Sequence, residues 1–252
     1  MPSSAKDLRV GLFVTCLVDL MRPCIGFATL KLLRAAGCAV VVPANQTCCG
    51  QPGYNSGDVP AAKALALKFL QEFDGCDYIV APSGSCAGMI RVHYAALFKD
   101  DPAFTDNYRR LTEHVYELTD FLVNIVKLED MPGDFSGTLT YHDSCSGLRE
   151  LNVQAQPRAL LARMPGVTLI EMREPATCCG FGGTFSIKFG DISARMADKK
   201  CQHIVETGAV GIVAGDLGCL LNIEGRLRRR GDWQTKVWHI AEVLAAGDDL
   251  CK

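Results

Sequence analysis

The chain has 252 residues, of which 48% are hydrophobic and 21% are charged, so it can form a packed core and is not disordered, collagen-like or a coiled coil. Its net charge of -2 gives no overall positive field, which argues against nucleic acid and anionic membranes as partners. Thirteen cysteines are many for a chain of this length, which does not need disulfides to fold.

The first apolar segment covers residues 10–18 and has the size of a short signal-peptide core. Asp19 follows it directly, without a small-residue cleavage site, and the segment has an internal counterpart that a cleaved peptide would lack. No apolar run approaches the roughly 18 to 20 residues of a membrane span. We therefore expect a cytoplasmic protein without a membrane span, in which the cysteines are reduced.

Six apolar, β-branched runs predict buried strands, and helical patterns lie between them. The predicted strands cover residues 9–15, 39–42, 77–81, 138–141, 167–171 and 209–214. One of the helices is predicted to begin after Asp58 as its N-cap, with Pro60 in the first turn. The alternation predicts an α/β fold made of two pseudo-symmetric tandem βαβαβα halves with mostly parallel sheets.

An internal repeat relates the two halves. Three segments match: VGLFVTCLVDL with GTLTYHDSCSGL, NQTCCGQPGYNSGD with PATCCGFGGTFSIKFGD, and CDYIVAPSGSC with AVGIVAGDLGC. A weaker similarity relates residues 114–122 to residues 236–244. The repeat predicts two cysteine-rich domains, residues 1–130 and 131–252.

The repeat also divides the cysteines into two groups. Eight occupy corresponding positions: Cys16, Cys48, Cys49 and Cys86, then Cys145, Cys178, Cys179 and Cys219. Five have no counterpart and are expected to be small buried side chains: Cys24, Cys38, Cys76, Cys201 and Cys251. Each of the eight follows a predicted strand. With the first strand of each half central, in the order 2-1-3, four thiols would meet at the carboxyl edge of each sheet, where such sheets bind ligands.

Four convergent thiolates can hold zinc or an iron-sulfur cluster. The long spacings between these cysteines differ from the C-x2-C pairs of zinc ribbons and from ferredoxin runs. Gly50 and Gly180 give the backbone freedom to aim both sulfurs of each adjacent pair at a multi-iron cluster, which favours iron-sulfur over a single zinc ion. The alternatives are a zinc-stabilised structural subunit and a thiol redox protein in which an adjacent pair reacts with a substrate disulfide.

The duplicated pattern resembles the cysteine-rich CCG domain found in heterodisulfide reductase, in the glycolate oxidase iron-sulfur protein and in lactate utilisation protein A. Five segments are most similar to the last family: VTCLVDLMRP, CCGQPGYNSGD, PSGSCAGM, YHDSC and TCCGFGGTFS. The resemblance covers nearly the whole chain. It implies a component of an oxidoreductase complex that converts L-lactate to pyruvate. Electrons would pass through clusters held by the eight cysteines, and the partners would be other iron-sulfur subunits.

One motif departs from the heterodisulfide reductase relatives, whose last element is CxxC and which have five cysteines per site. Ser83 and Asp216 occupy the first position of that element here. Four cysteines suffice for one [4Fe-4S] cluster or one zinc ion per half, the two halves need not hold the same metal, and Asp216 is a candidate oxygen ligand. Beside Cys145, His142 and Asp143 are candidates for tuning a cluster or moving protons; alternatively, Asp143 caps the following helix.

The other charged motifs favour structural roles. The run of arginines at positions 226 and 228–230 is expected to be the solvated end of a helix, or a docking point for an acidic partner. Four further histidines lack metal-ligand spacing: His93, His114, His203 and His239. No P-loop or strand-linked GxGxxG occurs in the sequence, so nucleotide binding has no support.

Overall fold

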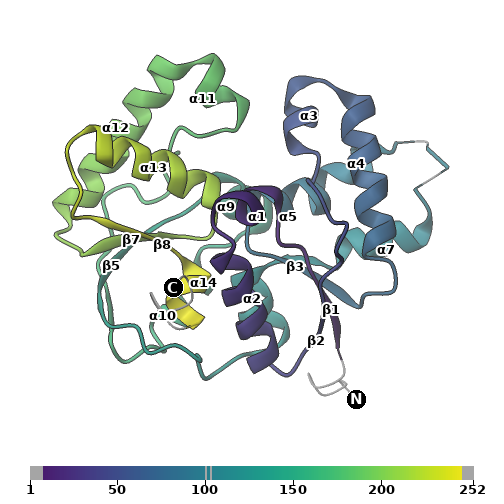
Figure 1. The fold of residues 1–252 in the computed structure, drawn as a ribbon, viewed down its shortest axis with the longest axis horizontal. Coiled ribbons are helices and arrows are strands. Elements are labelled where there is room, and N and C mark those ends of the chain that lie inside the picture. The colour runs from purple at the N-terminus through teal and green to yellow at the C-terminus, as the bar shows by residue number, and fades with distance from the viewer. Residues whose placement is uncertain (1–7, 100, 103, 246–252) are drawn as a thin grey trace.

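The computed structural model describes residues 8–99, 101–102 and 104–245 (Figure 1). The first half contains β1 (Arg9–Leu12), α1 (Cys16–Met21), α2 (Cys24–Ala35), β2 (Ala39–Val41), α3 (Gln51–Ser56), α4 (Val59–Glu72), β3 (Tyr78–Ala81), α5 (Gly84–Gly88), the π-helical η2 (Met89–His93), α6 (Tyr94–Leu97), α7 (Asp106–Glu113), β4 (Val115–Glu117), α8 (Leu118–Asp120) and the π-helical η3 (Phe121–Ile125). The second half contains β5 (Gly137–His142), α9 (Cys145–Leu151), α10 (Ala155–Leu161), β6 (Val167–Leu169), α11 (Thr184–Lys188), α12 (Gly190–Glu206), β7 (Gly211–Ala214), α13 (Leu217–Arg229), β8 (Lys236–His239) and α14 (Ile240–Ala245).

Each half forms one four-stranded parallel sheet, and the two sheets have the same strand order. The orders are β2-β1-β3-β4 and β6-β5-β7-β8. The first strand of each half lies between the second and the third, so the predicted order 2-1-3 is confirmed. The α/β prediction is confirmed, and the N-cap predicted for α4 is present, because Asp58 accepts a hydrogen bond from the amide of Ala61 at 3.1 Å.

The fourth strand of each half was not predicted. It coincides with the weak sequence similarity noted above, because β4 pairs with β3 and β8 pairs with β7 in equivalent registers. Each of these strands runs directly into a helix, α8 after β4 and α14 after β8. With three and four residues, the two strands are too short to show a clear alternation.

Helices at the ends of the two halves pack across the boundary between them. Helix α14 packs against α2 of the first half, and α8 and η3 pack against α10 of the second half. In Figure 1, α2 and α14 lie next to each other, between the strands β1 and β2 of the first half and the strands β5 and β7 of the second half. One apolar cluster contains Val10 and Leu32 together with Leu139 and Ile212, so residues of both halves share it. None of the described helices is long and apolar enough to cross a bilayer.

Three of the cysteines without a counterpart are as expected, because Cys38, Cys76 and Cys201 are free, buried apolar side chains. The prediction is wrong for Cys24, at the start of α2, which is half-buried and disulfide-bonded rather than a reduced thiol. Its sulfur lies 3.2 Å from the carboxylate of Glu242. Cys251 lies outside the described residues.

Candidate metal centre

Four thiols of the first half surround one cavity. Cys16 is the first residue of α1, Cys86 lies in α5, and Cys48 and Cys49 lie in the loop before α3. The sulfurs of Cys49 and Cys86 are 3.5 Å apart, and hydrogen bonds also connect Cys48 to Cys16 and to Cys49. The four residues line a cavity of about 160 Å³. The loops thus bring together the four thiols that the repeat singled out.

Four thiols of the second half come together in the same way. Cys145 is the first residue of α9, and Cys219 lies in the first turn of α13. Hydrogen bonds connect Cys145 to Cys178, and Cys179 to both Cys178 and Cys219. All four line a cavity of about 360 Å³. At the end of β5, a ring nitrogen of His142 and the sulfurs of Cys179 and Cys219 all lie within 4.8 Å of one another.

A left-handed glycine after each adjacent cysteine pair turns both sulfurs toward the cavity. Gly50 has φ of 85° and Gly180 has φ of 86°, and each amide donates to the sulfur two residues earlier, at 3.4 Å. A Cβ on Gly50 would lie 3.1 Å from the carbonyl oxygen of Ala62, and one on Gly180 would lie 2.7 Å from that of Ser193. Glycine is therefore required at both positions, because of its left-handed conformation and because the backbone lies so close to α4 or α12.

The thiols of each site share their protons rather than ionise together. Hydrogen bonds to Cys48 and Cys86, with burial, hold the pKa of Cys49 well above its usual range. Hydrogen bonds from Cys16 and Cys49 lower the pKa of Cys48, so this sulfur accepts from its neighbours as a thiolate. In the second site, a hydrogen bond to Cys178 and burial raise the pKa of Cys145. A bound cation would replace these protons, because only thiolates bind metals.

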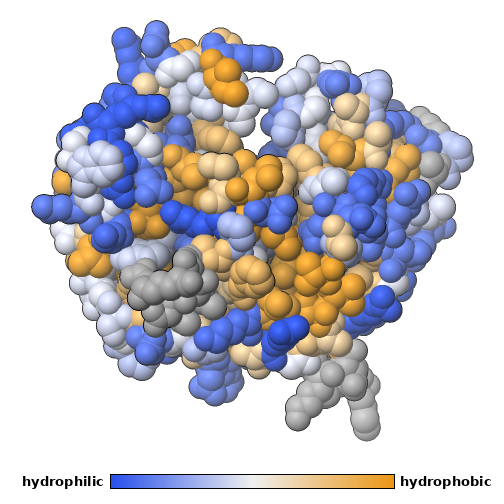
Figure 2. Space-filling view, viewed as in Figure 1, coloured by the Kyte–Doolittle hydropathy of each residue, from blue (hydrophilic) through white to orange (hydrophobic). Residues whose placement is uncertain are grey.

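The two cavities adjoin each other at the boundary between the halves. Five residues line both of them: Gln51, Ser85, Phe181, Gly183 and Asp216. The space-filling view shows the surface hollowed between the part containing α11 and the part containing α3 (Figure 2). Each half therefore contributes walls to the cavity of the other half.

Asp216 connects the two halves at this boundary. Its Oδ1 accepts from the amide of Gly218 at 3.2 Å and caps α13. Its Oδ2 accepts from the amide of Ser85 at 2.9 Å and from the hydroxyl of Ser83 at 3.2 Å, at the start of α5. Both oxygens of the candidate oxygen ligand thus already bind protein donors, and the carboxylate ties α5 to α13.

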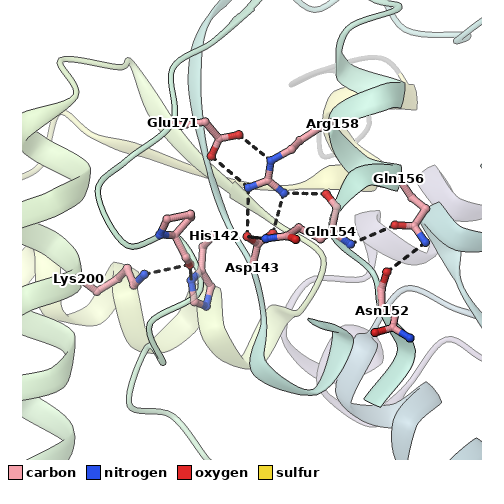
Figure 3. Close-up of polar contacts among 9 residues, drawn as sticks. His142, Asp143, Asn152, Gln154, Gln156, Arg158, Glu171 and Lys200 are labelled. Atoms are coloured by element: carbon pink, nitrogen blue, oxygen red, sulfur yellow. Dashed lines mark hydrogen bonds and ion pairs between the residues drawn. The ribbon is translucent and has the colours of Figure 1, made fainter. Parts of the chain in front are cut away.

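Asp143 is held in a buried ion pair (Figure 3). Its side chain is fully buried and accepts from Arg158 at 2.7 Å and from Gln154 at 3.3 Å, while Arg158 also pairs with Glu171 at 2.6 Å. The N-cap of α9 is Ser144, so the interpretation of Asp143 as a helix cap is wrong. The ion pair instead ties the end of β5 to α10.

Comparisons with known proteins agree with this arrangement. The family model for the cysteine-rich CCG domain matches residues 10–91 and 139–224. Lactate utilization protein A of Bacillus subtilis (strain 168) is 46% identical over 237 residues, which cover 94% of this chain and 99% of the relative. The chain belongs to the lactate utilization protein A family. The member from Geobacillus kaustophilus (strain HTA426) is 47% identical over 239 residues, covering 95% of this chain and 99% of the relative.

The donor set of this family member fits a soft metal or an iron-sulfur cluster. Thiolate sulfurs select zinc, copper(I) and iron-sulfur centres over hard cations. Burial and the nearby charge of Lys200 lower the pKa of His142 to about 3, so this imidazole is neutral, the form that binds metals. The residues present can therefore hold such a group in both halves.

Three side chains near the sites were not singled out by the sequence. Lys200 lies inside α12, is 1% exposed, and has a pKa lowered by burial. Phe181 follows the second adjacent pair and covers both cavities. His93, predicted to be structural or exposed, lines the second cavity from η2, with its Nε2 3.3 Å from Glu150. Lys200 and His93 lie outside the segments that repeat between the halves, whereas Phe181 lies inside one, at the position that Gln51 occupies in the first half.

The arginine run at the end of α13 is paired within the chain. Arg226 and Arg230 both pair with Asp198 of α12, and Arg228 pairs with Glu224 of its own helix. These contacts fit the predicted solvated end of a helix.

Proposed function

We propose that this chain is an iron-sulfur redox component of a cytoplasmic L-lactate oxidation system, and that its cysteines hold one cluster in each CCG domain, 1–130 and 131–252. The observation that carries the proposal is the pair of four-thiol sites whose cavities share a wall. Family membership supports the link to lactate, since the relatives are named lactate utilization protein A.

The residues around the thiols suit electron transfer more than substrate chemistry. Iron-sulfur clusters supply one-electron chemistry when bound. The chain supplies the sulfurs and covers them with Leu17, Phe181 and Leu217, so that the first cavity is lined mainly by apolar surface. Asp216 holds α5 and α13 together, which keeps the two sites next to each other.

Oxidation of lactate to pyruvate releases two electrons and two protons, which must reach an acceptor. We propose that other iron-sulfur subunits of the system bind this chain and share that transfer as parts of one oxidoreductase complex. Helices α1 and α2 carry the exposed apolar side chains Leu20, Met21 and Phe27, of which Leu20 is 77% exposed. Leu20 also lies beside Cys16 in a surface pocket, so a protein docked there would be close to the first site.

Metal analysis of the anaerobically purified full chain tests the proposal. We expect iron and acid-labile sulfide in equal amounts and a visible absorption that bleaches reversibly on reduction. Cys48→Ser and Cys178→Ser should each remove about half of the iron, because each disables one site. Cys38→Ser is the matched control and should leave the iron unchanged, since Cys38 is buried in the apolar core.

Two results would contradict the proposal. A colourless protein with one zinc ion in each half, and no redox titration, would identify a zinc-stabilised structural subunit. A metal-free protein that exchanges disulfides through an adjacent pair, Cys48 with Cys49 or Cys178 with Cys179, would identify a thiol redox protein.

A further inference from the structure

The imidazole of His142 has one ring nitrogen that the described residues leave without a hydrogen-bond partner. The side chain is completely buried, its Nδ1 lies 3.2 Å from the carbonyl oxygen of Pro175, and its Nε2 is buried and unpaired. A carbonyl oxygen only accepts, so Nδ1 carries the proton and Nε2 presents a lone pair. A buried polar atom without a partner is unfavourable, so a bound group that accepts this lone pair would stabilise the folded protein.

The position of this ring is set by a shared carbonyl group (Figure 3). The Pro175 carbonyl also accepts from the ammonium of Lys200 at 3.1 Å and from the amide of Asp143 at 3.2 Å. Lys200 is itself held by the carbonyl of Glu174 at 2.9 Å. Metal-binding histidines commonly donate their second ring nitrogen to a backbone carbonyl, which fixes both tautomer and orientation. His142 already has that arrangement in this structure.

The unpaired nitrogen belongs to the second thiol site. The ligand atoms of His142, Cys179 and Cys219 lie within 4.8 Å of one another, and all three residues are buried. This is close enough for one metal ion, or one edge of a cluster, to contact the ring and the sulfurs after small side-chain adjustments.

Among the described residues of the first half, the corresponding position has no ring nitrogen. Leu12 pairs with Val80 in the first sheet and Tyr141 pairs with Val213 in the second, so the next residues, Phe13 and His142, are equivalent. Phe13 packs against Phe69 with ring centroids 5.0 Å apart. The donors of the first site are therefore all sulfur.

We infer that His142 binds the metal of the second site through Nε2, so that the two sites of one chain have different donor sets. The inference rests on the proposed function to the extent that both sites hold metal. Where Nε2 takes the coordination position of one of the four thiolates, the ligand set loses a negative charge, which raises the reduction potential of an iron-sulfur centre. The second site is then the stronger electron acceptor, and the difference gives electron transfer between the sites a direction.

Nitrogen hyperfine coupling tests this inference without relying on activity. The anaerobic full chain is prepared with ¹⁵N-labelled histidine, and pulsed electron paramagnetic resonance is recorded on the reduced protein, or on cobalt(II)-loaded protein where zinc is the resident metal. We expect a ¹⁵N coupling at one of the two centres. His142→Phe, which copies the first half, should remove it and weaken cobalt(II) binding at that site at least about 10-fold.

His93→Phe is the matched control. This imidazole lines the same cavity, but its Nε2 is already paired with Glu150, so its replacement should leave the coupling intact. His142→Asn serves as a second variant, checked by circular dichroism, should the larger ring disturb folding; it too should lose the coupling.

The outcomes separate the two proposals. Metal bound without any ¹⁵N coupling, or a coupling that persists in His142→Asn, would overturn the inference and leave the proposed function standing. A protein that takes up neither iron nor cobalt in either site would overturn both.

Discussion

The buried carboxyl of Glu117 allows a sharp test of how the boundary between the halves is held. Glu117 ends β4 and is 2% exposed. Its Oε2 accepts from the amide of Thr119 at 2.7 Å and from that of Asp120 at 3.1 Å, which caps α8. Its Oε1 is buried with no hydrogen-bond partner among the described residues. Burial raises the pKa of this carboxyl from 4.5 to about 7.

The sign of the effect on stability follows from the raised pKa. Above pH 7 the carboxyl is ionised in both states, and the folded protein carries the cost of a buried charge, about 3 kcal/mol for a pKa raised from 4.5 to about 7. As the pH falls from 7 to 4.5, the folded state binds the proton before the unfolded state does. The free energy of unfolding should therefore rise over this interval and gain nothing more from Glu117 below it.

Glu117→Gln removes this charge and keeps an oxygen that can cap α8. We expect the variant to be more stable than the parent by up to about 3 kcal/mol at pH 8, and the difference to vanish near pH 4.5. For a chain of this size the gain corresponds to a Tm higher by roughly 6–12 °C. Urea unfolding of the reduced protein at several pH values measures the difference. Glu113→Gln, on the exposed side of α7, is the control and should change little.

A different result would refute this reasoning. If Glu117→Gln is equally or less stable at pH 8, or if its advantage does not depend on pH, the carboxyl is not a buried charge in the folded protein. A water or ion that pairs with Oε1 would produce that outcome.

Three further substitutions test the packing and the turns. Gly84→Ala places a methyl group 2.9 Å from the Cα of Gly147, across the contact between α5 and α9. It should lower the free energy of unfolding, measured in urea, by about 1–3 kcal/mol. An unchanged urea midpoint would mean that the two helices separate easily. Arg158→Leu leaves the buried carboxylate of Asp143 without its cation and should cost about 3–5 kcal/mol, unlike a surface pair whose loss is hardly measurable. Gly180→Ala should lower the metal content of the second site alone, measured as iron per chain; loss from both sites would point to general unfolding.

Much of the fold could be predicted because the repeat compares each strand with a second copy of itself. The runs around Val10 and Leu139 are apolar enough to identify the central strands, and their cysteines follow at the same distance. The fourth strands were not predicted, although the repeat weakly relates the segments that form them. The segment Val115–Glu117 has three residues, and its stability comes from pairing with β3, a contact that lies far away in the sequence.

The sequence predicted the sulfur ligands of each site but not the residues that surround them. Ser83 and Asp216 were recognised as replacements for cysteine, and Asp216 also as a candidate oxygen ligand. Because they occupy equivalent positions, the repeat aligns them but says nothing of contact between them, and the structure shows that the hydroxyl of one donates to the carboxylate of the other. Lys200 was missed for another reason. A lysine inside a helix is expected to face water, and here it is buried because two backbone carbonyls receive its ammonium group.

Contacts between equivalent residues connect the two halves. The hydroxyl of Ser83 and the carboxylate of Asp216, the N-caps of α5 and α13, meet at the boundary. Pro82 and Gly215, which precede these two N-caps, also contact the opposite half. The Nε2 of His239 lies 3.1 Å from the carbonyl of Pro82, and a Cβ on Gly215 would lie 3.2 Å from Oε1 of Glu117.

Each half therefore positions the helix start that carries the last cysteine of the other half. A separated first half would lose the partner of Ser85, whose amide binds Asp216, and would expose the face of α2 that α14 covers. A half separated from the other could hold metal only if these contacts were dispensable. The cross-boundary hydrogen bonds instead make the geometry of one site depend on the other. We therefore expect that disturbing either helix start will change the metal affinity of both sites.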